Sequence, residues 1–164
     1  MQKLKFEYIV TEYDSLEELN NDDQLLLNYA KQALELAYAP YSNYYVGAAL
    51  KLENGQIFKG NNQENAAYPS GLCAERVAAF SASSQYPDTP IHSIAISAKA
   101  KDFVVDLPVT PCGSCRQVFA ELQKRHKNSI RFILSGEIGK IYIIEGIENL
   151  LPLMFEAENL KKSV

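Results

Sequence analysis

The sequence predicts a single three-layer α/β domain, in which helices cover both faces of a mixed sheet of about five strands. Apolar residues recur at helical spacing in several segments, and short strand-like runs alternate with those segments. Asn54-Gly55 separates two such runs, as in a β-hairpin. Because a hairpin requires an antiparallel pair, the sheet is expected to be mixed.

The expected elements follow from local signals along the chain. Asn21, Asp22 and Asp23 offer a helix cap and negative charge at a helix start, and Pro111 stands just before another helix. In order, we expect a helix over 21–39, strands over 46–52 and 56–60, a polar loop over 61–71, a helix beginning near 73, a strand over 91–98, a loop over 99–109, a helix over 112–125, strands over 131–134 and 140–144, and a short helix over 147–155.

Length and composition are those of one soluble domain. The chain has 164 residues, of which 47% are hydrophobic and 22% charged. Residues 1–20 are interpreted as an N-terminal extension, and residues 21–164 as one domain. The net charge of −4 argues against a dedicated nucleic-acid binder, because such proteins usually carry a basic stripe.

The expected location is the cytoplasm, with no membrane partner. No segment reaches the roughly 18 apolar residues of a membrane helix. Residues 1–10 place Lys3, Lys5 and Glu7 among their apolar residues and lack the apolar centre of a signal peptide.

Three cysteines lie where helices are expected to begin. Their odd number excludes a complete intramolecular disulfide framework. A helix N-terminus favours the thiolate, which is the form that binds metals. Cys112 and Cys115 are spaced to reach one ion, and Cys73 would complete a set of three ligands. Three ligands plus one open position are typical of a catalytic zinc, so we expect one Zn²⁺ per chain.

Other interpretations of these residues stay open at this point. The cysteines could be small buried hydrophobic residues, or Cys112 and Cys115 could form a redox pair in a non-catalytic zinc or redox module. The redox interpretation leaves Cys73 and Glu75 unexplained. Glu75 could be a surface carboxylate at a helix N-terminus, but beside a metal with an open position it could take a proton from water.

Two segments together resemble the signature of the small, three-cysteine cytidine deaminases: Cys73-Ala74-Glu75-Arg76 and Pro111-Cys112-Gly113-Ser114-Cys115-Arg116-Gln117-Val118. Further matches are Pro40-Tyr41-Ser42, Val46-Gly47-Ala48-Ala49, Asn62-Gln63-Glu64-Asn65-Ala66-Ala67-Tyr68-Pro69, and Leu150-Leu151-Pro152 with Phe155. The resemblance covers roughly residues 25 to 160.

The resemblance implies a three-layer α-β-α cytidine deaminase fold and a homotetramer that acts in pyrimidine salvage. The implied reaction is hydrolytic deamination of cytidine and deoxycytidine to uridine and deoxyuridine, with release of ammonia. Glu75 would take a proton from water, pass it to N3 of the pyrimidine and help protonate the leaving amine. Arg76 would donate hydrogen bonds toward the ligand sulfurs and offset the negative charge of three thiolates on Zn²⁺.

The resemblance also implies a substrate pocket. Asn62 and Glu64 would bind ribose hydroxyls, and Tyr44 would stack on the base. Ala66, through its backbone, and Tyr68 would line the same pocket. Phe155 would reach the site of a neighbouring subunit.

The chain departs from the family pattern at four places. Tyr44-Tyr45 replaces Phe-Pro, residues 99–110 form a longer segment than usual, residues 1–20 extend beyond the compact core, and Glu156-Ala157 replaces Gly-Pro. These departures concern substrate preference and subunit contacts. A deaminase of another aminopyrimidine nucleoside, such as a blasticidin-type antibiotic, is the nearest alternative.

Overall fold

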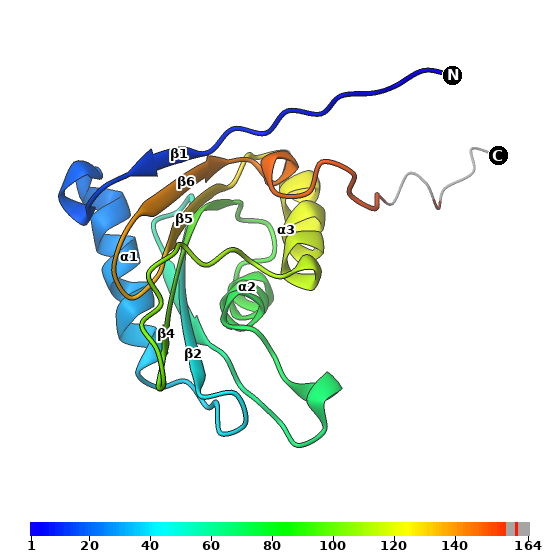
Figure 1. Ribbon diagram of the computed structural model, residues 1–164. Coiled ribbons are helices and arrows are strands. Elements are labelled where there is room, and N and C mark those ends of the chain that lie inside the picture. Colours follow the sequence, from blue (N-terminus) through cyan, green and yellow to red (C-terminus); the bar gives the residue numbers. More distant parts are fainter. Residues whose placement is uncertain (157–159, 161–164) are drawn as a thin grey trace.

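A six-stranded mixed sheet forms the centre of the molecule (Figure 1). The computed structural model describes residues 1–156 and 160. Along the chain, the elements are β1 (Thr11–Tyr13), η1 (Leu16–Glu18), α1 (Asn21–Leu34), β2 (Tyr44–Leu52), β3 (Ile57–Asn61), η2 (Tyr68–Ser70), α2 (Ala74–Gln85), β4 (Ile91–Ala100), α3 (Gly113–His126), β5 (Arg131–Ser135), β6 (Ile141–Glu145) and η3 (Ile147–Asn149).

The order of strands in the sheet is β1-β6-β5-β4-β2-β3. Only β4 and β5 pair in parallel among these neighbours, and α3 forms the crossover between them. The hairpin of β2 and β3 turns at Asn54-Gly55, where Gly55 has a φ of +84°. The predicted mixed sheet is therefore confirmed.

The predicted number of strands is wrong, because β1 adds a sixth. This strand lies within residues 1–20 and pairs antiparallel with β6. Its three residues, Thr-Glu-Tyr, are too few to show a strand period, and the neighbouring β6 supplies their hydrogen-bonding partners.

Two predicted helices are shorter than expected. Residues 147–155 contain only the 3₁₀ turn η3, and Pro152, which has no backbone N–H, cannot continue it as a helix. The first helix ends at Leu34 rather than near Pro40. Its N-cap is Asn20, whose Oδ1 accepts a hydrogen bond from the backbone N–H of Asp23 at 2.9 Å.

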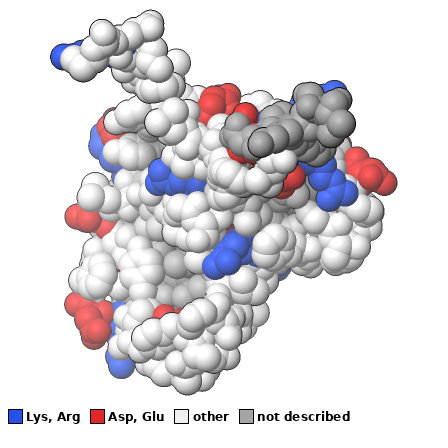
Figure 2. Space-filling model, turned by 90° about the vertical axis from the view of Figure 1, so that its right-hand side faces the viewer, with Lys and Arg blue, Asp and Glu red and all other residues white. Residues whose placement is uncertain are grey.

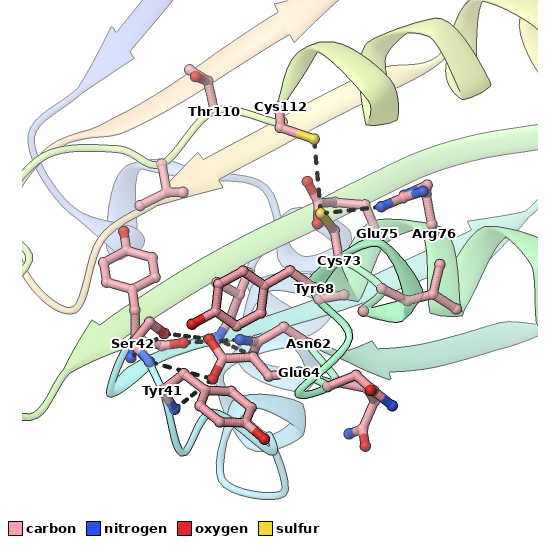
Figure 3. Close-up of a pocket in the computed structure, with 18 residues that line it drawn as sticks. Tyr41, Ser42, Asn62, Glu64, Tyr68, Cys73, Glu75, Arg76, Thr110 and Cys112 are labelled. Carbon is pink, nitrogen blue, oxygen red and sulfur yellow. Dashed lines mark hydrogen bonds between the residues drawn. The ribbon is translucent and has the colours of Figure 1, made fainter.

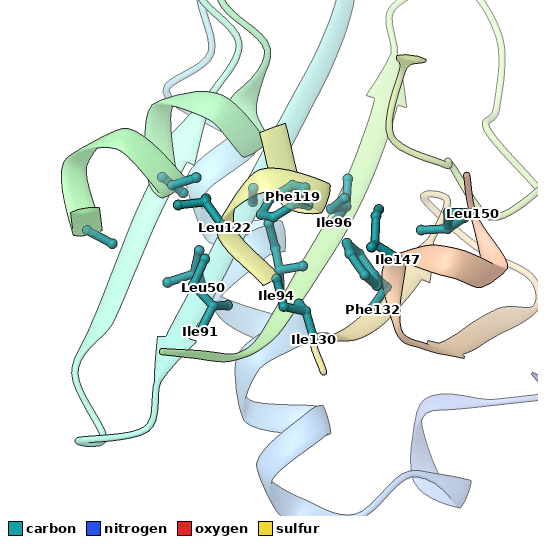
Figure 4. Close-up of a cluster of buried hydrophobic side chains, with 14 of the residues drawn as sticks. Leu50, Ile91, Ile94, Ile96, Phe119, Leu122, Ile130, Phe132, Ile147 and Leu150 are labelled. Atoms are coloured by element: carbon teal, nitrogen blue, oxygen red, sulfur yellow. The ribbon is translucent and has the colours of Figure 1, made fainter. Parts of the chain in front are cut away.

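Helices cover both faces of the sheet, which confirms the predicted three-layer architecture. Figure 1 shows α1 on one face and α2 with α3 on the other. The core on the α1 side contains Leu26, Leu27 and Ala30, packed on Ile133 of β5. The larger core lies beneath α2 and α3, where Phe119 and Phe132 are fully buried (Figure 4).

Two glycines let helices approach the sheet closely. A Cβ added at Gly47 of β2 would lie 2.0 Å from the carbonyl oxygen of Ala30 in α1. A Cβ added at Gly60 of β3 would lie 2.4 Å from the carbonyl oxygen of Ala74, in the first turn of α2. The backbone of each helix therefore rests directly on a strand.

We expect Phe132→Ala to destabilise the protein by about 3–5 kcal/mol, because it leaves a large cavity in the core. The Phe132 ring packs edge-on against Phe119, with centroids 5.5 Å apart and an interplanar angle of 86°. Urea unfolding would measure the loss. Phe80→Ala is the matched control, since Phe80 is 47% exposed and should change stability much less.

Candidate active site

The N-termini of α2 and α3 meet on one face of the sheet and bring the three cysteines together. Cys73 is the N-cap of α2 and Cys112 the N-cap of α3, while Cys115 lies in the first turn of α3. Neither N-cap side chain makes a capping hydrogen bond to the backbone of its own helix. Both sulfur atoms are therefore directed at a shared point rather than used for capping (Figure 3).

The geometry of the three sulfurs fits a single zinc ion. All three Sγ atoms lie within 4.8 Å of one another. The Sγ of Cys112 lies 3.7 Å from that of Cys73 and 3.5 Å from that of Cys115. Two thiolates on a tetrahedral zinc, at Zn–S of about 2.3 Å, would be about 3.8 Å apart. Within the described part of the chain, this is the only such metal-binding group of three residues.

The ionisation of the three cysteine thiols indicates that a cation would stabilise this cluster. Hydrogen bonding from Cys115, with a contribution from Arg76, lowers the pKa of Cys73 to about 5. The same interaction with the Cys73 thiolate, together with burial, raises the pKa of Cys115 far above its ordinary value. One thiol therefore ionises readily while the other resists ionisation. A divalent cation would stabilise all three thiolates together.

Arg76 supports the cluster from the first turn of α2. Its Nη2 donates a hydrogen bond to the Sγ of Cys73 at 3.7 Å. This contact raises the pKa of Arg76, so the guanidinium is charged. Its Nε atom is buried with no hydrogen-bonding partner in the structure. The guanidinium thus places a positive charge beside the sulfurs.

Glu75 is a buried carboxyl group beside the cysteines. Only 4% of the residue is exposed, yet it lines the same pocket as Cys73 and Cys112. Figure 3 shows its side chain next to Cys73. Burial raises the pKa of Glu75, so this group gains a proton more readily than an exposed carboxylate. A carboxyl group in this setting is suited to general acid–base catalysis.

A pocket of about 780 Å³ extends from the cysteines to a polar end. This volume lies in the range of small-molecule sites. At the polar end, Glu64 accepts hydrogen bonds from the Ser42 hydroxyl at 2.5 Å and from the Tyr41 backbone N–H at 2.8 Å. The bond from Ser42 lowers the pKa of Glu64, so it is a carboxylate at neutral pH.

Asn62 lies beside Glu64 and is fixed by the backbone of β2. Its Oδ1 accepts from the Val46 N–H at 2.8 Å, and its Nδ2 donates to the Tyr44 carbonyl at 2.9 Å. An amide can make four hydrogen bonds, so one donor and one acceptor position remain for a ligand.

The structure brings most of the predicted site residues to this pocket. The predicted residues that line it are Tyr44, Asn62, Glu64, Tyr68, Cys73, Glu75, Arg76 and Cys112. Cys115 is fully buried behind the other two cysteines. Ala66 does not line the pocket. Phe155 lies at α3, where its backbone exchanges hydrogen bonds with the Gln117 side chain.

Sequence reasoning did not single out ten of the residues that line the pocket, among them Tyr41, Ser42, Val109 and Thr110. Tyr41 and Ser42 belong to a motif that carries the family resemblance, and this motif could have identified them. The Tyr41 ring packs edge-on against Tyr68, with centroids 5.9 Å apart. Val109 and Thr110 have no distinctive sequence signal.

Comparison with known proteins decides the family. A model of the "cytidine and deoxycytidylate deaminase zinc-binding region" matches residues 20–128. The chain is 42% identical to the cytidine deaminase of Halalkalibacterium halodurans over 139 residues, which cover 85% of this chain and 98% of the relative. The chain belongs to the cytidine and deoxycytidylate deaminase family. The resemblance predicted from the sequence is thus confirmed.

Further relatives agree with this assignment. The cytidine deaminase of Sporosarcina psychrophila is 40% identical over 141 residues, which cover 85% of this chain and 95% of the relative. The crystal structure of cytidine deaminase from Burkholderia pseudomallei has a TM-score of 0.70 and 38% identity, and covers 84% of this chain and all of that chain. The match to a zinc-binding region and the three-sulfur cluster both identify zinc as the cofactor.

The surface beside α2 and α3 is mostly uncharged. In Figure 2, the Lys and Arg side chains of the described residues are scattered over this face and form no continuous basic band. A deaminase of polymeric nucleic acid would need such a band along the path of the strand. Among the described residues, no helix has the length and apolar character needed to cross a membrane.

Proposed function

We propose that this protein catalyses the zinc-dependent hydrolytic deamination of cytidine and deoxycytidine to uridine and deoxyuridine, with release of ammonia. One observation carries the proposal. The three-cysteine cluster and the buried Glu75 carboxyl group lie at one end of a pocket whose other end carries Asn62 and Glu64. This arrangement can hold a base and a sugar at the same time.

Glu75 moves the protons of the reaction. Cys73, Cys112 and Cys115 would hold the zinc ion, which would supply Lewis acidity that lowers the pKa of the attacking water. Glu75 takes one proton from the water and gives it to N3 of the pyrimidine as the water oxygen bonds to C4. It then transfers the remaining hydroxyl proton to the amino group, so that the C4–N bond breaks, the C4 carbonyl forms and ammonia leaves. Its raised pKa suits this alternation between acid and base.

Arg76 and the pocket walls set the conditions for this chemistry. Three thiolates give Zn²⁺ a net charge of −1, which weakens its ability to activate water. The Arg76 guanidinium, at 3.7 Å from the Cys73 sulfur, withdraws part of that negative charge. Tyr44 and Tyr68 provide aromatic surface for the base and the sugar, and the backbone of Ala66 adjoins Asn65, which lines the pocket.

The sugar end of the pocket explains a preference for nucleosides over free bases. Ribose hydroxyls both donate and accept hydrogen bonds. Glu64 supplies acceptor oxygens, and Asn62 supplies one free donor and one free acceptor position. Both side chains are held by the β2 segment and the loop before it, so little order is lost when a sugar binds.

Assembly and cellular role form part of the same proposal. The enzyme acts as a homotetramer in cytoplasmic pyrimidine salvage, and residues 21–164 form its catalytic domain, with residues 1–20 as an extension. Phe155 is 58% exposed and lies outside the pocket of its own chain, so it is free to complete the site of a neighbouring subunit. The mainly uncharged face in Figure 2 is suited to subunit packing.

An absorbance assay combined with metal analysis tests the proposal. Purified protein should contain about one zinc per chain, because three ligands and one water complete one site. It should convert cytidine and deoxycytidine to their uridine products. A zinc-loaded protein that deaminates neither nucleoside would refute the proposal, and preferred turnover of an aminopyrimidine antibiotic would reassign the substrate.

We expect Glu64→Ala to lower kcat/KM for cytidine by about 10- to 150-fold, which corresponds to the loss of a hydrogen bond to a charged group. The slow reaction of free cytosine should barely change, because cytosine has no sugar to bind. Initial rates with both substrates measure the contrast. Equal losses for both would instead indicate a folding defect, since Glu64 also holds Tyr41 and Ser42. Glu121→Ala, on the exposed side of α3, is the control.

A further inference from the structure

Two aromatic rings pack together at the edge of the pocket. The Phe103 ring lies against the Tyr44 ring, with centroids 6.4 Å apart and an interplanar angle of 31°. Tyr44 lines the pocket, whereas Phe103 does not. Phe103 belongs to residues 101–110, which connect β4 to α3 and are here named the 101–110 loop. Any effect of Phe103 on a substrate must therefore pass through Tyr44.

The 101–110 loop is anchored on the turn between β5 and β6. Val105 is buried, and its carbonyl oxygen accepts hydrogen bonds from the backbone N–H groups of Glu137 at 2.8 Å and Ile138 at 3.3 Å. A Cβ added at Gly136 would lie 2.3 Å from the same Val105 oxygen. This close backbone contact fixes the middle of the loop, two residues after Phe103.

The beginning of the loop is anchored beside Tyr44. The Lys101 backbone N–H donates to the Asn43 carbonyl oxygen at 3.0 Å. In the sheet, Tyr44 is the register partner of Ala100, the last residue of β4. Phe103 thus lies between two fixed points, Lys101 and Val105, and both hold it on the side of Tyr44.

Among the described residues, hydrogen bonds hold the backbone of Tyr44 and none holds its hydroxyl. Its N–H donates to the Ser42 hydroxyl at 3.1 Å, and its carbonyl oxygen accepts from the Asn62 amide at 2.9 Å. These bonds fix the start of β2 and do not reach the ring, whose position depends on packing. An aromatic ring at 6.4 Å restricts that rotation and covers one side of Tyr44.

We infer that Phe103 is a positioning residue for substrate binding, which holds the Tyr44 ring in place as a wall of the pocket. This inference rests on the proposed function, since it assigns Tyr44 to the wall that meets the nucleoside. Tyr44 would touch a bound substrate both before and during the reaction. Loss of its support therefore weakens binding more than it slows the chemical step.

A double-mutant cycle tests the inference. We expect Phe103→Ala to raise KM for cytidine by about two- to tenfold, the range typical of one aromatic pair, with kcat nearly unchanged. In a Tyr44→Ala background, the same change should have no further effect, because Phe103 acts only through Tyr44. Val104→Ala is the control: Val104 is its exposed neighbour in the same loop, and its change should leave KM unaltered.

A second measurement does not depend on activity. Protein labelled with 3-fluorotyrosine carries ten labelled tyrosines, and the resonance that Tyr44→Phe removes identifies Tyr44. This fluorine resonance should move in Phe103→Ala and stay in place in Val104→Ala. An unmoved resonance, an unchanged KM, or a KM that rises equally in the Tyr44→Ala background would each overturn the inference. If Phe103→Ala dissociates the oligomer and leaves the Tyr44 resonance unmoved, the inference is also overturned, because Phe103 would then be a subunit contact.

The two proposals fail in different ways. A zinc-loaded wild type that deaminates no cytidine refutes the proposed function, and the fluorine resonance still decides whether Phe103 holds Tyr44. If the wild type is active and the Tyr44 resonance does not move in Phe103→Ala, the proposed function stands and the positioning role of Phe103 is refuted.

Discussion

Glu75→Gln is expected to lower kcat for cytidine by at least about 10²-fold, the low end for loss of a general acid–base group. Glutamine keeps the size of glutamate and most of its hydrogen bonding, but it cannot accept or return a proton. Because Glu75 is buried against the pocket and lies outside the group of three cysteines, the metal should stay bound. Steady-state rates and zinc content, measured on the same preparation, check both parts.

The matched control makes the same chemical change elsewhere. Glu121→Gln, on the exposed side of α3, should retain wild-type turnover. Near-normal activity of Glu75→Gln would show that another group transfers the protons. Loss of zinc from this variant would show that the carboxylate supports the metal rather than the reaction.

Cys115→Ser is expected to weaken zinc retention strongly and, with it, to lower activity. Cys115 is fully buried at the start of α3, and its sulfur is 3.5 Å from that of Cys112. Groups that only orient ligands already change metal affinity by about 10- to 100-fold, so loss of a ligand should weaken binding by at least about 10²-fold. Competition with a chelator, followed by elemental analysis, measures the affinity.

Ser114→Ala is the control for the cysteine variant. Ser114 is exposed, lies in the same helical turn and separates Cys112 from Cys115. Its change should leave zinc content and turnover at wild-type values. Full zinc content in Cys115→Ser would mean that Cys73 and Cys112 hold the ion with a ligand outside this cluster, and would contradict the three-cysteine site.

The parts of the fold that sequence predicted well are those governed by short-range signals. Asn54-Gly55 specifies a tight turn through glycine's access to positive φ, so the β2–β3 hairpin could be predicted from two residues. Cys73, Cys112 and Cys115 could be grouped because a metal needs convergent thiolates, and helix N-termini favour thiolates. Their proximity across 39 residues was inferred from chemistry rather than from any local pattern.

The parts that sequence missed depend on contacts between distant segments. The strand β1 exists because β6 lies beside it, and its three residues carry no periodic signal. The buried Asp23 carboxylate accepts hydrogen bonds from Arg131, which is 108 residues away, and this pair ties α1 to β5. The contact of Phe103 with Tyr44 likewise requires the three-dimensional path of the 101–110 loop.

Gly60 shows that a residue can be intolerant of mutation without taking part in the reaction. Any larger residue there would press on the carbonyl of Ala74 and on the Ala78 N–H, 2.6 Å from an added Cβ. The first turn of α2, which also carries Cys73 and Glu75, would have to lift from the sheet. In a library of single substitutions selected for growth, Gly60 would therefore be as restricted as a residue that touches the substrate. The positions that tolerate no substitution would therefore include the residues beneath α2 as well as those that line the pocket. Intolerance of substitution alone would not identify a catalytic residue.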